Sequence, residues 1–201
     1  MTAGEFWNKQ EFSYLVTYSF NRGPKLEAYQ QAAQAWFKLI RASLLTAPPA
    51  QLSALREQLR LLERTHDLTR LSLTDEAGAF HLTASPVSVI SQGTSAAQEI
   101  AGLFQLPVVD EPAWMCAPVY RDALAFYDEQ DQLLGVLNIC FDCEWMVTHT
   151  GQRVQADTAA YEGLRACLGR AGHLLGQQYV NTRSGNLGTP QSPARPAHQP
   201  E

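Results

Sequence analysis

The chain has 201 residues, of which 45% are hydrophobic and 17% are charged, and its formal net charge is −5. Such a length and composition predict a soluble globular protein with a single hydrophobic core. The negative charge argues against a nucleic-acid-binding face, which is normally basic, and the sequence has no apolar run long enough to span a membrane.

The first segment with a clear pattern is a strand over residues 13–20, which is rich in aromatic and β-branched residues. A turn at residues 21–24 separates it from a helix expected over residues 25–45. Apolar residues of this helix recur at steps of three and four, so they share one face. We expect Trp36 and Phe37 to anchor that face in the core.

A second helix is expected after Pro48 and Pro49, because proline ends one helix and is tolerated in the first turn of the next. Its apolar stripe consists of Leu52, Leu55, Leu59 and Leu62. Arginines alternate with glutamates on its other side, at positions 56, 57, 60, 63 and 64. Mixed charge at helical spacing is typical of a solvated face rather than of a basic recognition helix.

Residues 70–83 alternate with a period of two and predict a hairpin that turns at residues 75–78. Its buried face would hold Leu71, Leu73, Phe80 and Leu82. The connection 85–93 has no clear pattern. Ser95 and Gln98 have the spacing of a capping box, which would open a helix that ends near Phe104.

The segment from Cys116 to Cys143, CAPVYRDALAFYDEQDQLLGVLNICFDC, predicts a second hairpin. Residues 123–127 form its first strand, 128–132 its loop and 133–141 its return strand. The return strand is apolar on both faces, which favours a central position in a sheet. Asn138 is the exception, and a buried amide there would need hydrogen-bond partners.

After Cys143 the sequence predicts irregular structure, followed by a last helix that Asp157 could cap. From residue 181 the composition changes to Gly, Pro, Ser, Gln and Asn, which is typical of disorder. Together the segments predict an α+β fold with about five mostly antiparallel strands and helices packed on the sheet. We expect one domain over residues 1–180 and a disordered tail over 181–201.

The central hairpin resembles that of a group of small bacterial proteins. The shared pattern is Cys116-x-Pro118, then Phe126-Tyr127-Asp128, then Ile139-Cys140-Phe141-x-Cys143. The resemblance covers about a seventh of the chain. It implies a shared hairpin and a shared role for the cysteines, and it implies no activity.

The cysteines are the residues most capable of chemistry. Cys140 and Cys143 have the spacing of half a zinc site, Cys116 is a third candidate ligand, and the fourth could be His149, Cys167 or no residue at all. Two alternatives are a redox pair and plain structural cysteines. If the cysteines are only structural and Cys143 lies near the surface, a Cys143→Ser substitution should cost little stability.

The N-terminus lacks the layout of a signal peptide, so we expect a cytoplasmic protein. Four cysteines are too few for a disulfide scaffold in a chain of this length, and in a reducing compartment they would be thiols or metal ligands. Acid, base and nucleophile do not form a recognisable constellation, which favours a non-catalytic binding or interaction module without a cofactor. The alternative is a thiol-redox or zinc-binding protein that acts through Cys116, Cys140 and Cys143.

Overall fold

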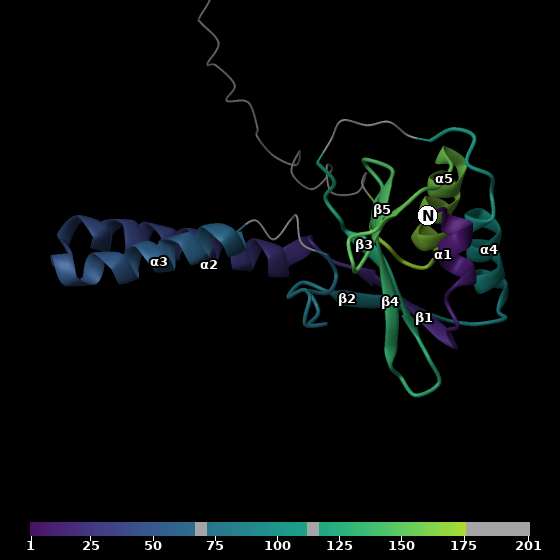
Figure 1. The fold of residues 1–201 in the computed structure, drawn as a ribbon, viewed down its shortest axis with the longest axis horizontal. Coiled ribbons are helices and arrows are strands. Elements are labelled where there is room, and N and C mark those ends of the chain that lie inside the picture. Colours follow the sequence, from purple (N-terminus) through teal and green to yellow (C-terminus); the bar gives the residue numbers. More distant parts are fainter. Residues whose placement is uncertain (67–71, 112–116, 176–201) are drawn as a thin grey trace, which may run out of the picture.

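The computed structural model describes residues 1–66, 72–111 and 117–175, except for the side chains of residues 63–66. It has two parts: a sheet with helices on it, and a pair of long helices, α2 and α3, that projects away from the sheet (Figure 1). The α+β fold with an antiparallel sheet is therefore as predicted. No helix of these described ranges is both long and apolar enough to cross a bilayer.

The sheet has six antiparallel strands in the order β2-β1-β3-β4-β5-β6. Their bounds are β1 Tyr14–Ser19, β2 Ser85–Ser91, β3 Asp122–Tyr127, β4 Leu133–Cys140, β5 Trp145–Thr148 and β6 Arg153–Val154. The predicted central hairpin is β3 and β4, and it pairs Leu124 with Leu137. β4 lies between β3 and β5, so its double-sided apolar pattern correctly indicated an inner strand.

The helices α1 (Ala3–Asn8), α4 (Ser95–Phe104) and α5 (Thr158–Arg170) lie together on one side of the sheet (Figure 1). The core beneath them is rich in aromatic rings in edge-to-face contact. Phe126 of β3 is at its centre, because the rings of Phe6, Trp7 and Phe12 all pack within 6 Å of it, at centroid distances of 5.6, 5.9 and 5.3 Å. α1 was not predicted; it begins with a capping box formed by Thr2 and Glu5.

The opposite face of the sheet has a smaller core. Its members are Phe20, Leu73, Tyr120, Ala123, Ala125, Val136, Cys140, Cys143 and Val147. The amide of Asn138, a residue of β4, is fully buried and has the hydrogen-bond partners that its burial requires. Its oxygen accepts from the Leu73 N–H at 2.7 Å, and its nitrogen donates to the Val147 carbonyl at 3.4 Å.

The predicted hairpin over residues 70–83 is wrong in its strands and right in its turn. In the part that the structure describes, the two sides share one isolated bridge, between Thr74 and Phe80. The turn forms because Asp75 Oδ1 accepts from the N–H groups of residues 77 and 79. Phe80 and Leu82 are exposed by 40% and 67%, whereas the polar His81 and Thr83 beside them are buried. A polar contact between those two, 2.9 Å from Thr83 Oγ1 to His81 Nδ1, has overridden the apolar alternation.

Three boundaries also differ from the predictions. The connection over residues 85–93 contains β2, and the residues after Cys143 contain β5 and β6. Thr94, not Ser95, caps α4, since its side chain accepts from the Ala97 N–H. Asp157 caps α5 as predicted. The expected tail over 181–201 lies outside the described residues.

β2 is an edge strand, paired on one side only, with β1. It contains Pro86, which has no N–H to donate. The register of the β1–β2 pair shifts between Thr17 and Tyr18, opposite this proline. At the other edge, β6 has two residues.

Candidate functional site

The projecting helix pair is the most distinctive surface of the protein, and we call it the arm. It consists of α2 (Gly23–Thr46) and α3 (Pro49–His66). α2 ends at Thr46, and Pro48 lies one residue beyond it while Pro49 begins α3, so the chain turns sharply and α3 runs back along α2. Ala33 and Ile40 are the buried residues of α2, and the predicted leucine stripe of α3 is half-buried. The two helices therefore pack along a seam of a/d type.

Beside this seam, both helices present uncharged side chains to the same side. At 3.6 residues per turn, the residues of α2 that point this way between positions 28 and 43 lie in line with Trp36, and those of α3 lie in line with Gln58. We call this surface the arm face. It is formed by Ala32, Trp36, Leu39 and Ser43 of α2 and by Ala54, Gln58 and Leu61 of α3.

The arm face exposes large apolar side chains. Trp36 is 58% exposed, Leu39 57% and Leu61 60%. The prediction that Trp36 anchors the core is therefore wrong, and its partner Phe37 is only half-buried. The predicted helical period of α2 was right, but the helix projects away from the sheet. One of its apolar stripes therefore packs against α3, and the neighbouring stripe is exposed to solvent.

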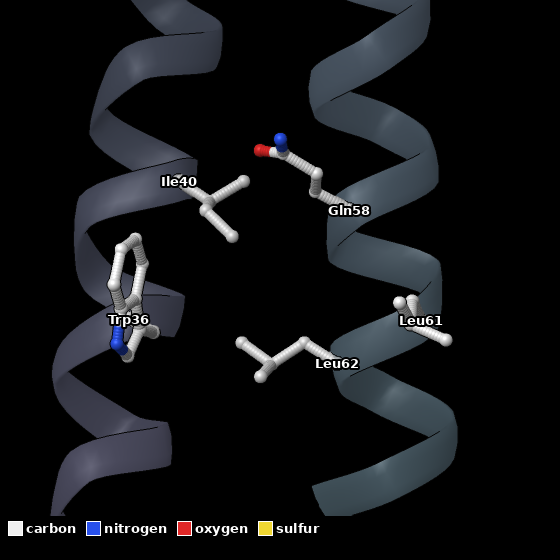
Figure 2. A pocket seen from close by; sticks show the side chains of 5 residues that line it. All are labelled: Trp36, Ile40, Gln58, Leu61 and Leu62. Carbon is white, nitrogen blue, oxygen red and sulfur yellow. The ribbon is translucent and has the colours of Figure 1, made fainter.

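A pocket of about 350 Å³ opens on the arm face between the two helices. Figure 2 shows Trp36 and Ile40 on α2 and Gln58, Leu61 and Leu62 on α3 around it. Among the lining residues that the structure describes, Gln58 is the one polar residue and none is charged. Such a recess can accept an apolar side chain, because its walls offer contact area without a charge to desolvate.

Most charged residues of the arm lie on its other sides, and Lys25, which is in line with Trp36, lies at the base of the arm. Lys38 and Arg41 point away from Trp36 on α2. On α3, Glu57 and Arg60 form an exposed ion pair with an N–O distance of 3.2 Å. The predicted solvated charged side of α3 is thus confirmed for these residues. Between positions 23 and 66 the sequence has six basic and three acidic residues, whereas the rest of the chain has nine and seventeen.

The base of the arm is fixed by an unusual backbone turn. Asn21 has φ 52° and Gly23 has φ 80°, so two residues near each other adopt left-handed angles. Asparagine adopts such angles more readily than most residues other than glycine, and its neighbours hold it there. Here the Asn21 N–H donates to Thr83 Oγ1 at 2.8 Å, and the Asn21 side-chain amide donates to the Tyr120 carbonyl at 2.8 Å.

A buried ion cluster secures the same junction. Arg22 immediately precedes α2, and its Nη2 lies 2.5 Å from Asp122 Oδ2 of β3. It also donates to the carbonyls of residues 121 and 174. The side chains of Arg22 and Asp122 are only 12% and 4% exposed. The arm is therefore tied to the sheet and to the segment after α5 by one guanidinium group.

The cluster continues through a histidine. His173 Nδ1 lies 2.7 Å from Asp122 Oδ1, and His173 Nε2 lies 2.8 Å from Thr17 Oγ1. Thr17 in turn contacts Ser88 Oγ at 2.9 Å. Because an ionised carboxylate only accepts, Nδ1 of His173 must donate to Asp122. The chain Asp122–His173–Thr17–Ser88 thus links β3, β1 and β2 to the end of the described chain.

A hydroxyl, an imidazole and a carboxylate in this order are the parts of a nucleophilic triad. The geometry of this cluster opposes that use, because Thr17 and the His173 side chain are both 0% exposed. No substrate carbonyl could reach the Thr17 hydroxyl without opening the sheet. The arrangement instead satisfies buried polar groups and holds the arm in place.

The predicted cysteine site is only partly described. Cys140 is 2% exposed and is a free thiol, while Cys143 is 7% exposed and is disulfide-bonded. Both belong to the smaller core. Cys116 lies outside the described residues. Cys167 is a free thiol of α5, in the larger core on the other side of the sheet.

Burial raises the pKa of the Cys167 thiol, with a further contribution from Glu99, so this thiol is a poor nucleophile at neutral pH. His149 is exposed, and its Nδ1 accepts from the Val136 N–H at 3.3 Å. Among the residues that the structure describes, no group of three or more His, Cys, Asp or Glu side chains could hold a metal ion.

Sequence reasoning missed the arm face and the ion cluster. The face had a signal, because Ala32, Trp36 and Leu39 follow a second apolar stripe beside the seam. The cluster joins residues 51 to 156 positions apart, and single-sequence patterns carry no information on such contacts. Comparison with protein-family models, curated proteins and solved structures finds no match. What the protein does has to be inferred from its own geometry.

Proposed function

We propose that the protein is a non-catalytic interaction module that binds a helical protein segment on the arm face. The observation that carries the proposal is the uncharged strip over two helices, where Trp36, Leu39 and Leu61 are each more than half exposed. Apolar surface of this kind is stabilised when another apolar surface covers it, at roughly 25 cal/mol per Å².

The shape of the surface favours a helix as the ligand. Two parallel ridges with a recess between them match the helix-in-groove mode, in which side chains spaced three and four residues apart enter the groove. The pocket at Trp36 and Leu61 would take one such anchor. Exposed tryptophan is also the residue type that most often dominates binding energy at interfaces.

The junction supports the same function. A binding surface held on a fixed lever loses less conformational entropy when it binds than one on a mobile segment. Arg22, Asp122 and His173 fix the direction in which the arm leaves the sheet. We infer that this is why a costly buried ion cluster lies at the base of the arm rather than elsewhere.

A second candidate function is thiol–disulfide exchange at Cys143, which one observation favours: this residue is disulfide-bonded. Its 7% exposure in the smaller core opposes exchange, because an attacking thiolate must reach the sulfur in line. A structural disulfide accounts for the same observation. A metal role for Cys116, Cys140, Cys143 and His149 stays a prediction.

The test of the interaction function is photo-cross-linking with the full chain in the cells that produce it. A benzophenone amino acid replaces Leu39 on the arm face or, as a control, Leu45. Leu45 is 87% exposed but points away from the arm face, on the opposite side of α2. We expect a discrete cross-linked polypeptide from position 39 and not from position 45, with the cross-link in a helix.

The captured polypeptide is then purified and titrated against the full chain. Trp36→Gln should raise the Kd at least tenfold, whereas Leu45→Gln should leave it unchanged. If position 39 gives no product, or if both positions give the same products, the arm face is not a binding site and the proposal fails.

A further inference from the structure

We propose that the arm face binds the arm face of a second copy of this chain, so that two arms form a four-helix bundle. This inference rests on the proposed interaction function and names its partner. The observations that carry it are the distribution of charge on the arm and the presence of both a recess and an exposed apolar side chain on the arm face.

Charge distribution favours pairing through this face. A two-fold axis brings each surface against itself, so any charge on the interface meets a like charge unless it lies off the axis with an opposite partner. Between positions 28 and 43 of α2 and between 51 and 62 of α3, the side of the arm that carries Trp36 has no charged residue, and Lys25 lies outside this range at the base of α2. The arm as a whole has an excess of three positive charges, so its other faces repel their own copies.

The area of the face sets the strength of the contact. Its uncharged part on α3 runs from position 51 to 62 and is therefore about 18 Å long, and two neighbouring helices are about 20 Å wide. Two such faces together bury on the order of 700 Å², which is below the roughly 1,000 Å² of a stable interface and fits a weak, transient contact. We therefore expect a dimer whose population depends on protein concentration, rather than an obligate one.

The face is also self-complementary in shape. Leu39 projects from α2 one turn from the pocket that Trp36, Ile40 and Leu61 help to line. In a two-fold pair, Leu39 of each copy can enter the pocket of the other, since a contact from residue i to j is always repeated from j to i. Each pairing thus fills two recesses, which is how knobs enter holes in helical bundles.

Two other occupants are less suited to the face. Residues 176–201 of the same chain hold few large apolar side chains, among them Tyr179, Val180 and Leu187, and no repeating stripe. Their composition therefore offers little apolar surface for a face with three exposed large side chains. An unrelated helix would need its own uncharged stripe, and this chain already supplies one in α2.

The experiment is sedimentation velocity of the full chain between about 1 µM and 1 mM, a range that brackets the Kd of small interfaces. We expect the wild type to move from monomer to dimer across this range. Trp36→Gln should shift the midpoint at least tenfold toward higher concentration, and Leu45→Gln should not. Leu61→Gln tests the same face from α3, and unchanged far-UV circular dichroism excludes unfolding of the arm.

Each outcome decides between the inference and the function on which it rests. A monomer at every concentration overturns self-pairing, and a cross-link from position 39 to a different protein then leaves the interaction function standing. A monomer without any cross-link overturns both. A dimer that ignores Trp36→Gln and Leu61→Gln uses another surface, which overturns the inference. A cross-link within one chain to residues 176–201 makes the tail the occupant and overturns it as well.

Discussion

Single polar residues decide how the arm is held and how the last helix begins. Arg22, Asp122 and His173 contact one another at this junction, so the loss of the Asp122 carboxylate leaves the Arg22 guanidinium without its counter-charge. The backbone turn at Asn21 depends on the same neighbourhood. Hydrogen bonds and ion pairs therefore hold this junction together, whereas apolar packing holds the core of the sheet together.

The first prediction concerns the junction. Asp122→Asn should lower the free energy of unfolding by about 3–5 kcal/mol, because it leaves the buried Arg22 guanidinium without its counter-charge. The matched control is Asp142→Asn. Asp142 pairs with Arg121 at 2.7 Å, but both side chains are exposed, so about 0–1 kcal/mol is expected. Urea denaturation of both variants measures the difference, and equal losses would contradict this assignment.

The second prediction concerns Asp157, the N-cap of α5. Hydrogen bonds from the N–H groups of Asp110, Ala159 and Val109 hold the pKa of its carboxyl below the usual 3.8. A carboxyl whose pKa is depressed in the folded state adds stability above its unfolded pKa and loses it as the pH falls through the folded pKa.

Asp157→Asn should therefore lower the Tm at pH 7 and converge with the wild type as the solution is acidified below about pH 4, the range set by an ordinary aspartate. Thermal unfolding at several pH values gives the two curves. A Tm difference that stays constant down to pH 2 would show that the charge of Asp157 is not the source of the effect.

The close approach of α4 and α5 depends on one of two glycines in these helices. A Cβ atom built on Gly163 of α5 would lie 2.2 Å from Leu103 Cδ2 of α4, so glycine is what allows these two helices to touch. Gly102 of α4 has no atom within 4 Å of such a Cβ. A side chain at Gly163 would therefore collide with α4, whereas one at Gly102 would meet open space.

The third prediction uses this pair. Gly163→Ala should destabilise the protein by about 1–3 kcal/mol through overpacking, despite the better helix propensity of alanine. Gly102→Ala should stabilise it by about 0.5–1 kcal/mol, since only propensity changes there. Combining Gly163→Ala with Leu103→Ala should recover part of the loss beyond additivity in a double-mutant cycle. Two stabilising alanines would refute the close approach.

Much of the fold could be predicted from local pattern and the rest could not. The apolar run of residues 133–141 was enough to place β4 inside the sheet, and Asp157 was enough to start α5. The period of α2 identified its helix but not its surroundings, so Trp36 was placed in a core that lies elsewhere. His173 and Thr17 meet across 156 positions of sequence, and their pairing follows from tertiary packing alone.

For the molecule as a whole, the disulfide at Cys143 changes the physical setting that the sequence suggested. Disulfides are rare in reducing compartments, so the expectation of a cytoplasmic protein stays a prediction to be tested. The expected small cost of Cys143→Ser assumed a position near the surface. Cys143 is instead buried at 7% exposure, next to Val147 and Cys140 in the smaller core.

The fourth prediction follows. Adding dithiothreitol should lower the Tm by about 5–10 °C, from a disulfide contribution of about 2–4 kcal/mol in a chain of this size. Cys143→Ser should lower it comparably and should abolish any further response to the reductant. Free-thiol titration of the unfolded chain without reductant counts the oxidised cysteines directly. A wild type that is indifferent to dithiothreitol would contradict the prediction.

The two ends of the sheet limit how copies of this protein can assemble. β2 offers its outer edge with a proline as its second residue, and β6 at the other end has two residues. A neighbouring strand that tried to extend the sheet would find a missing donor at Pro86 at one end and almost no template at the other. The sheet is therefore protected against open-ended growth into fibres, so an association through the arms can end at a closed pair.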